Sequence, residues 1–160
     1  MSKSLKLAAA LVAAAVLAGC AQTAEQKPAA PAAAAQPAGQ KFTAQLSGAQ
    51  EVPPVPGSAA GSADVTYNPS TKILTWKVSM TGLSGEAQAA HFHGPAGPGQ
   101  NAGVMLPLAP KGMKLGNPIQ GSAELKDDVA KALQAGQLYI NIHTAANPNG
   151  ELRGQVVPAK

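Results

Sequence analysis

The chain has 160 residues, and its 12 lysine and arginine residues outnumber its 8 acidic residues, which gives a formal net charge of +4. This small excess, with a single arginine at Arg153, excludes the basic footprint of a nucleic-acid-binding protein. A chain of this length suits one folded domain rather than two.

The first 19 residues have the order of charge and hydrophobicity that is typical of an export signal. Lys3 and Lys6 precede an uncharged apolar run from Leu7 to Ala18, as in a secretory signal peptide. The run has about a dozen residues, fewer than the roughly 20 that a membrane-spanning helix needs. We therefore expect residues 1–19 to be cleaved, which would remove two lysines and lower the net charge from +4 to +2.

Cys20 is the only cysteine in the chain and directly follows Leu17, Ala18 and Gly19. This tetrapeptide resembles the lipobox of bacterial lipoproteins, in which the thiol is acylated and becomes the first mature residue. The resemblance implies a lipid anchor, including palmitate, on Cys20. Because Ala21 is not the aspartate of an inner-membrane retention signal, it also implies an outer-membrane lipoprotein that faces the periplasm. An acylated Cys20 leaves no thiol for a disulfide, a metal ligand or a nucleophile. The alternative is a plain signal peptide with an unrelated cysteine.

Residues 20–40 are rich in alanine, proline and glutamine and carry few charges. Such a segment cannot bury a core, and its prolines favour extended backbone. We expect a spacer between the lipid anchor and a single domain at residues 41–160.

The expected domain has the alternating apolar and polar pattern of β-strands. Its eight runs are residues 42–46, 63–67, 74–78, 88–93, 103–108, 119–125, 137–143 and 151–157. Short strands separated by glycine- and proline-rich turns predict an all-β domain, an antiparallel Greek-key β-sandwich or barrel of about eight strands.

Two features complete the predicted fold. Asp127 and Asp128 begin a run of helix formers that stops at Gly136, which predicts a short helix across one end of the sandwich. Trp76 lies on an alternating apolar run, so we expect its side chain to anchor the core.

All three histidines of the chain lie in two segments that end predicted strands. His91 and His93 flank Phe92, and side chains two apart on a strand share a face, with Cα atoms about 6.6 Å apart. His143 ends another predicted strand and can meet this pair from an adjoining position. Three imidazoles placed in this way can converge on one ion at about 2.0 Å each.

Three neutral imidazoles without a thiolate predict a site for a copper ion, with zinc as the alternative. The fourth position is left to water, a carboxylate or a thioether, and Met105 is the candidate thioether because it follows the histidine pair most closely. The alternative is that the histidines only hydrogen-bond backbone at strand ends, because a short His-x-His motif arises by chance.

Several polar residues are candidates for groups that orient an imidazole through its second nitrogen. Asn141 shares a strand face with His143, and Glu151 and Arg153 share a face of the last predicted strand. Glu151 and Arg153 could instead form an exposed ion pair of little energetic weight. Glu51 is either a surface acid or a carboxylate of the site.

Separated motifs, in order along the chain, resemble the CHRD domain, which is named after chordin. They are residues 46–54 (LSGAQEVPP), 90–96 (AHFHGPA), 139–144 (YINIHT) and 148–156 (PNGELRGQV). The resemblance covers nearly all of residues 41–157. It implies a β-sandwich module of extracellular animal proteins and bacterial secreted proteins, without an established enzymatic activity.

The histidine arrangement is also similar to the copper ligands of the Cu,Zn superoxide dismutases, which are Greek-key barrels. This chain has no further histidine for a bridging ligand or a zinc site and lacks the disulfide cysteines. The similarity therefore implies copper binding but not dismutase activity.

Three functions follow from these residues. The first is a membrane-anchored lipoprotein that binds copper through His91, His93 and His143 for metal handling or protection of the cell envelope. The second is a non-enzymatic interaction module that binds an envelope protein partner or a cell-wall component and whose histidines are structural. The third, which we rank last, is a metal-dependent redox enzyme, so an enzymatic activity is not our leading expectation.

Overall fold

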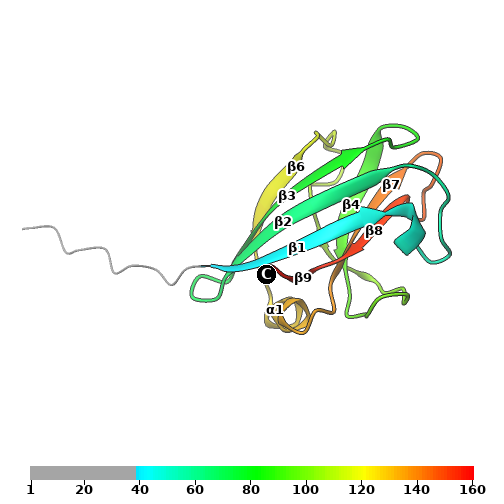
Figure 1. The fold of residues 1–160 in the computed structure, drawn as a ribbon. Helices are drawn as coiled ribbons and strands as arrows, with labels where there is room; N and C mark the ends of the chain where they lie inside the picture. Colours follow the sequence, from blue (N-terminus) through cyan, green and yellow to red (C-terminus); the bar gives the residue numbers. More distant parts are fainter. Residues whose placement is uncertain (1–38) are drawn as a thin grey trace, which may run out of the picture. The chain divides into compact units, whose positions relative to one another are not determined.

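The computed structural model describes residues 39–160, so the predicted signal peptide, Cys20 and nearly all of the predicted spacer lie outside the described residues. Figure 1 shows an antiparallel sheet that curls into a half-barrel, with one short helix at its end. The predicted all-β class with a single short helix is confirmed.

Residues 39–160 form nine strands, one α-helix and one 3-10 turn. Their bounds are β1 (Gln40–Ser47), η1 (Gly48–Gln50), β2 (Ala60–Asn68), β3 (Ile73–Thr81), β4 (Ala87–His93), β5 (Val104–Pro107), β6 (Ile119–Glu124), α1 (Asp127–Gln134), β7 (Tyr139–Thr144), β8 (Leu152–Gln155) and β9 (Val157–Pro158). Each of the eight predicted runs corresponds to a strand. The last run is divided into β8 and β9 at Val156, whose N–H donates to the carbonyl of Leu138.

The strands follow the order β5-β4-β7-β8-β1-β2-β3-β6 across the sheet, and β9 pairs with β1. Every pairing is antiparallel. Consecutive strands β1, β2 and β3 form a meander, whereas β7 lies between β4 and β8. This order places β4 beside β7 although the two strands are far apart in the sequence.

The apolar side chains of the alternating strands face one core. Phe92, Ile140 and Ile142 are fully buried there. The indole N–H of Trp76 donates to the carbonyl of Leu108 at 3.2 Å, and its ring meets Phe92 edge-on with centroids 5.6 Å apart. The prediction that Trp76 anchors the core is confirmed.

Helix α1 closes the core at one end of the curled sheet (Figure 1). Its apolar residues, among them Val129 and Leu133, are buried in the same cluster as the strands. The helix is followed by Gly136 with φ +67°, as the glycine stop predicted. In the part of the chain that the structure describes, no helix has the length and hydrophobicity needed to cross a membrane.

Candidate metal centre

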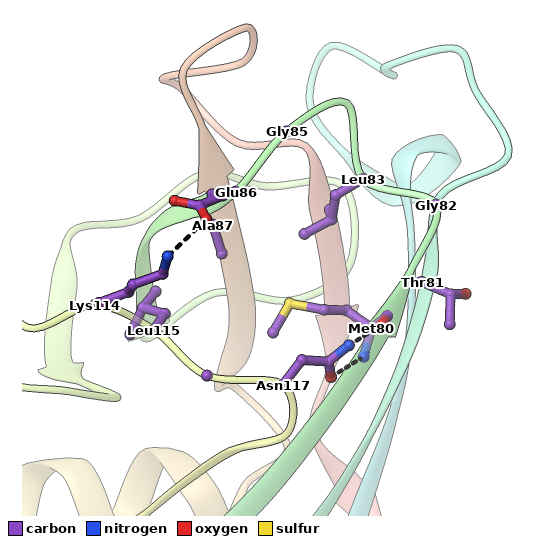
Figure 2. A pocket seen from close by; sticks show the side chains of 11 residues that line it. Met80, Thr81, Gly82, Leu83, Gly85, Glu86, Ala87, Lys114, Leu115 and Asn117 are labelled. Carbon is purple, nitrogen blue, oxygen red and sulfur yellow. Dashed lines mark hydrogen bonds and ion pairs between the residues drawn. The ribbon is translucent and has the colours of Figure 1, made fainter.

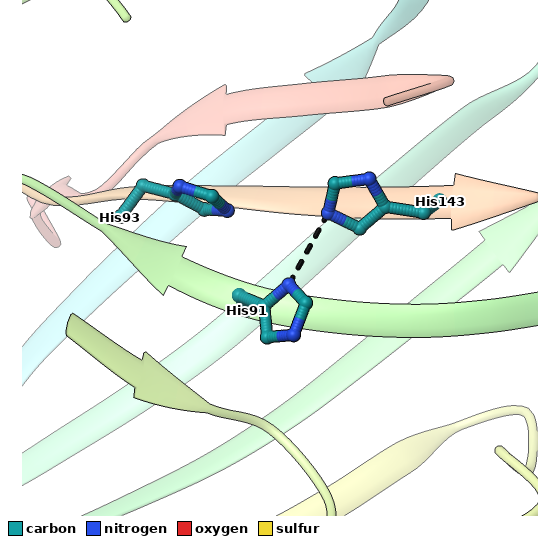
Figure 3. A group of neighbouring side chains, drawn as sticks. All are labelled: His91, His93 and His143. Carbon is teal, nitrogen blue, oxygen red and sulfur yellow. Dashed lines mark hydrogen bonds between the residues drawn. The ribbon is translucent and has the colours of Figure 1, made fainter. Parts of the chain in front are cut away.

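The three histidines lie together on the face of the sheet opposite the core. His91 and His93 point away from the core because Phe92 between them points into it, and the same alternation applies to His143 after Ile142. Strands β4 and β7 are neighbours, so the side chains of the two segments meet (Figure 3). One nitrogen from each imidazole lies within 4.8 Å of the other two.

Backbone carbonyls determine which nitrogen each of two imidazoles can offer to an ion. Nδ1 of His93 is 3.0 Å from the carbonyl oxygen of Ala102, and Nδ1 of His143 is 3.1 Å from that of Pro148. A carbonyl only accepts hydrogen bonds, so we assign the proton of both rings to Nδ1. The lone pair of both rings is therefore on Nε2.

These lone pairs are directed into the cluster. Nε2 of His143 is 3.2 Å from Nδ1 of His91, and Nε2 of His93 is buried without a hydrogen-bond partner among the described residues. Two nitrogens bound tetrahedrally to one metal at 2.0–2.1 Å would be about 3.3 Å apart. The observed contact between His91 and His143 is close to this value, and the three ligand nitrogens all lie within 4.8 Å of one another.

Burial lowers the pKa of all three imidazoles. At His91 the neighbouring His93 lowers the pKa further. The carbonyl bonds of His93 and His143 raise their pKa values in part, and Arg153 opposes this at His93. The rings are therefore neutral near pH 7 and able to donate their lone pairs to a metal.

The candidate orienting residues lie near the histidines but bind other groups. Arg153 is 2% exposed and Glu151 is 4% exposed, so the alternative of an exposed ion pair between them is wrong. Arg153 donates to the segment 97–101, and the carboxylate of Glu151 accepts from Ser84, Thr144 and Asn147. Burial raises the pKa of Glu151, but these hydrogen bonds outweigh it and bring the pKa to about 2.

Asn141 and Glu51 form a buried pair beside the histidines. Nδ2 of Asn141 donates to Oε1 of Glu51 at 2.7 Å, and Glu51 is 6% exposed. Glu51 is thus not a surface acid. Burial raises its pKa to about 7, although Arg153 and the Asn141 amide lower it in part.

Met105 lies on β5, next to the histidine strand β4, but its side chain packs against the core. Its Sδ lies close to the backbone of Gly94, because a Cβ atom added to this glycine would be 3.2 Å from the sulfur. Among the histidine and acidic side chains of residues 39–160, the three histidines form the ligand group that the structure brings together. A thioether ligand from Met105 stays a prediction.

Tyr139 has a part in the site that the sequence did not predict. Its ring lies between the imidazole of His93, with centroids 5.1 Å apart and planes 12° apart, and the guanidinium of Arg153, 3.6 Å from the ring centroid. Its hydroxyl donates to the carbonyl of Ala102 and accepts from the N–H of the same residue. Tyr139 alternates with Asn141 and His143 along β7, and this shared face was its one signal in the sequence.

A separate hollow of about 480 Å³ lies between the end of β3, the start of β4 and residues 114–117. Figure 2 shows Met80, Leu83 and Leu115 around it, and the ion pair of Lys114 and Glu86 at 2.8 Å on one side. None of the three histidines lines this hollow. It is therefore distinct from the candidate metal centre.

The curled antiparallel sheet and the histidine cluster on its polar face define a β-module with a candidate metal centre. Residues 42–156 match the model of the CHRD domain, and the chain belongs to this family. The resemblance of the sequence motifs to this domain is confirmed. Chordin from Xenopus laevis is 32% identical over 123 residues, which cover 73% of this chain and 13% of Chordin. The chain thus corresponds to a small part of that relative, and no solved structure matches it.

Proposed function

We propose that this chain is a membrane-anchored envelope lipoprotein whose CHRD domain binds a copper ion through His91, His93 and His143. Its role would be metal handling or protection of the envelope. The observation that carries the proposal is the cluster of three imidazoles, in two of which a backbone carbonyl fixes the lone pair on Nε2. Of these, Nε2 of His93 is buried without a hydrogen-bond partner among the described residues. Burying such an acceptor has a free-energy cost that a bound metal would offset.

The donor set favours copper over zinc. An all-imidazole site has no thiolate or carboxylate to select a particular ion, and at such sites Cu²⁺ binds more tightly than Zn²⁺. Zinc remains the alternative because it also accepts three histidines and a water.

Metal titration tests this proposal. We expect the purified protein to bind one Cu(I) or Cu(II), and Zn(II) more weakly, whereas a variant with His91→Gln, His93→Gln and His143→Gln loses this binding. Gln88→Ala, an exposed position on the same strand β4, is the matched control and should bind like the wild type. Equal affinity of the triple variant and the wild type would rule out the histidine site.

The lipid anchor is supported by the sequence around Cys20 alone. We expect the expressed protein to incorporate labelled palmitate and to fractionate with the outer membrane, because acyl chains anchor through about 0.8 kcal/mol per buried methylene. Cys20→Ser should abolish both properties. Labelling that persists in Cys20→Ser would contradict the proposal.

A second candidate function is an interaction module, and the hollow beside Leu83 favours it. An open hollow of about 480 Å³, lined by both apolar and polar residues and flanked by an ion pair, has the size of a site for a partner's side chains. In this case an envelope partner should be retained equally by the wild type and the triple histidine variant, and lost by Leu83→Asp. Loss of the partner on chelation would count against this function.

A further inference from the structure

Two loops flank the histidine cluster, and each supplies the carbonyl that fixes one imidazole. Residues 94–103 join β4 to β5 and contain Ala102, the acceptor for His93. Residues 145–151 join β7 to β8 and contain Pro148, the acceptor for His143. The tautomers of the two rings therefore depend on where these loops lie.

Arg153 holds the first loop. Its guanidinium donates to the side-chain oxygen of Asn101 at 2.9 Å and to the carbonyls of Gln100 and Gly97. All three partners are acceptors, which matches a side chain that has five donors and no acceptor. Stacking on Tyr139, which itself binds Ala102 through its hydroxyl, connects Arg153 to the carbonyl that His93 uses.

Glu151 holds the second loop with the opposite chemistry. One carboxylate oxygen accepts from the backbone N–H of Ser84 at 2.7 Å, and the other accepts from the hydroxyls of Ser84 and Thr144 and from the amide of Asn147. A carboxylate accepts at both oxygens, whereas a glutamine amide would direct its own donors at donors. The backbone carbonyl of Asn147 in turn accepts from the N–H groups of Thr144 and Gly150 and so fixes the turn that contains Pro148.

We infer that Arg153 and Glu151 are positioning residues of the metal centre, which act through the carbonyls of Ala102 and Pro148 rather than by touching an imidazole. Arg153 sets the tautomer of His93, and Glu151 sets that of His143. This inference rests on the proposed function for its effect on metal binding, but its effect on the tautomers is independent of metal. This role of Arg153 and Glu151 is indirect, since neither side chain makes a hydrogen bond to an imidazole.

The tautomers can be read directly by NMR of the full chain with ¹⁵N-labelled histidine at pH 8, where the imidazoles are neutral. In the wild type, His93 and His143 should both carry the proton on Nδ1. Arg153→Lys, which keeps the charge but loses the planar fork of donors, should give a mixture of tautomers at His93 and leave His143 unchanged. Glu151→Gln should do the reverse.

This crossed pattern separates positioning from general destabilisation, which would affect both rings in either variant. Glu86→Gln, which removes an exposed acid outside both loops, is the charge-matched control and should change neither ring. If a buried substitution prevents folding, Asn101→Ala and Asn147→Ala remove the loop partners of Arg153 and Glu151 instead. Unchanged tautomers in both pairs of variants, or equal changes at both rings, would overturn the inference.

Titration with Cu(II) then connects the tautomers to metal binding. Each positioning variant should weaken binding by about 10- to 100-fold, the usual effect of removing a group that orients a metal ligand. In a His93→Gln background, Arg153→Lys should cause no further loss, because its effect passes through His93. If the wild type shows the expected tautomers but does not bind copper, the proposed function fails while the positioning role stands. A full further loss in the His93→Gln background would exclude the route through His93.

Discussion

The two nitrogens of His93 and of His143 have different tasks. One nitrogen of each ring donates to a backbone carbonyl, so the other must be an acceptor. Without that constraint a neutral imidazole could carry its proton on either nitrogen. Only the tautomer with the proton on Nδ1 offers the lone pair of Nε2 to a metal.

Copper affinity should be nearly constant around neutral pH and should fall on acidification. Burial lowers the pKa values of His91, His93 and His143, so protons compete for the lone pairs only below the ordinary imidazole range near 6.5. Cu(II) titrations between pH 5 and pH 8 measure this dependence. A midpoint above pH 6.5 would contradict the lowered pKa values.

Glu51 should make the protein less stable as the pH rises. Its pKa is about 7 in the folded protein against 4.5 ordinarily, so the folded state binds more protons between these values. The free energy of unfolding therefore falls as the pH increases through this window, by up to about 3.5 kcal/mol at about 1.4 kcal/mol per pH unit. Below pH 4.5 both states are protonated and the contribution is constant.

Urea unfolding of Glu51→Gln at pH 5, 6, 7 and 8 measures this effect. The amide mimics the protonated carboxyl, so the variant should gain stability relative to the wild type as the pH rises. Glu86→Gln, at an exposed acid, should follow the wild-type curve. A difference between Glu51→Gln and the wild type that does not change with pH would show that ionisation of Glu51 is not its cause.

At the scale of elements, the strands and the helix could be predicted because their information is local. The alternation in β2 and β3 and the stop at Gly136 each need only a few neighbouring residues. The convergence of the histidines also followed from strand periodicity. The burial of Arg153 could not be predicted, because it depends on contacts with a loop 52 to 53 residues earlier in the chain. Backbone carbonyls such as that of Ala102 have no signal in the sequence at all.

The loop between β7 and β8 should tolerate little change at Gly150. This residue has φ +131°, and a Cβ there would lie 2.6 Å from Nδ2 of Asn141 and 2.7 Å from Oε1 of Glu51. Gly150→Ala should therefore cost at least about 3 kcal/mol of unfolding free energy from backbone strain and overlap. Gly136→Ala, where φ is +67° and nothing lies within 4 Å, should cost only about 1–2 kcal/mol.

Denaturant unfolding of the two alanine variants separates two costs. Gly136→Ala introduces backbone strain alone, whereas Gly150→Ala adds steric overlap of the new Cβ with Asn141 and Glu51. Equal losses would mean that the Asn141 and Glu51 pair moves aside without cost. Gly150→Ala should also weaken copper binding, because the same loop contains the carbonyl that orients His143.

At the scale of the whole molecule, the core and the candidate metal centre occupy opposite faces of one sheet. Strands β4 and β7 contribute Phe92, Ile140 and Ile142 to the core and the three histidines to the other face. An ion bound across these two strands would join them by a second set of contacts besides their hydrogen bonds. Metal binding should therefore stabilise the fold as a whole.

Thermal unfolding tests this coupling and separates a metal site from structural histidines. A ligand at 100 times its Kd that binds only the folded state adds about 2.7 kcal/mol, which corresponds to a rise in Tm on the order of 10 °C for a domain of this size. We expect this rise with Cu(II) or Zn(II) for the wild type, its reversal by a chelator, and none for the triple variant His91→Gln, His93→Gln and His143→Gln. Histidines that served only to hydrogen-bond the loops would instead give a triple variant with a lowered Tm and a wild type whose Tm does not respond to either ion.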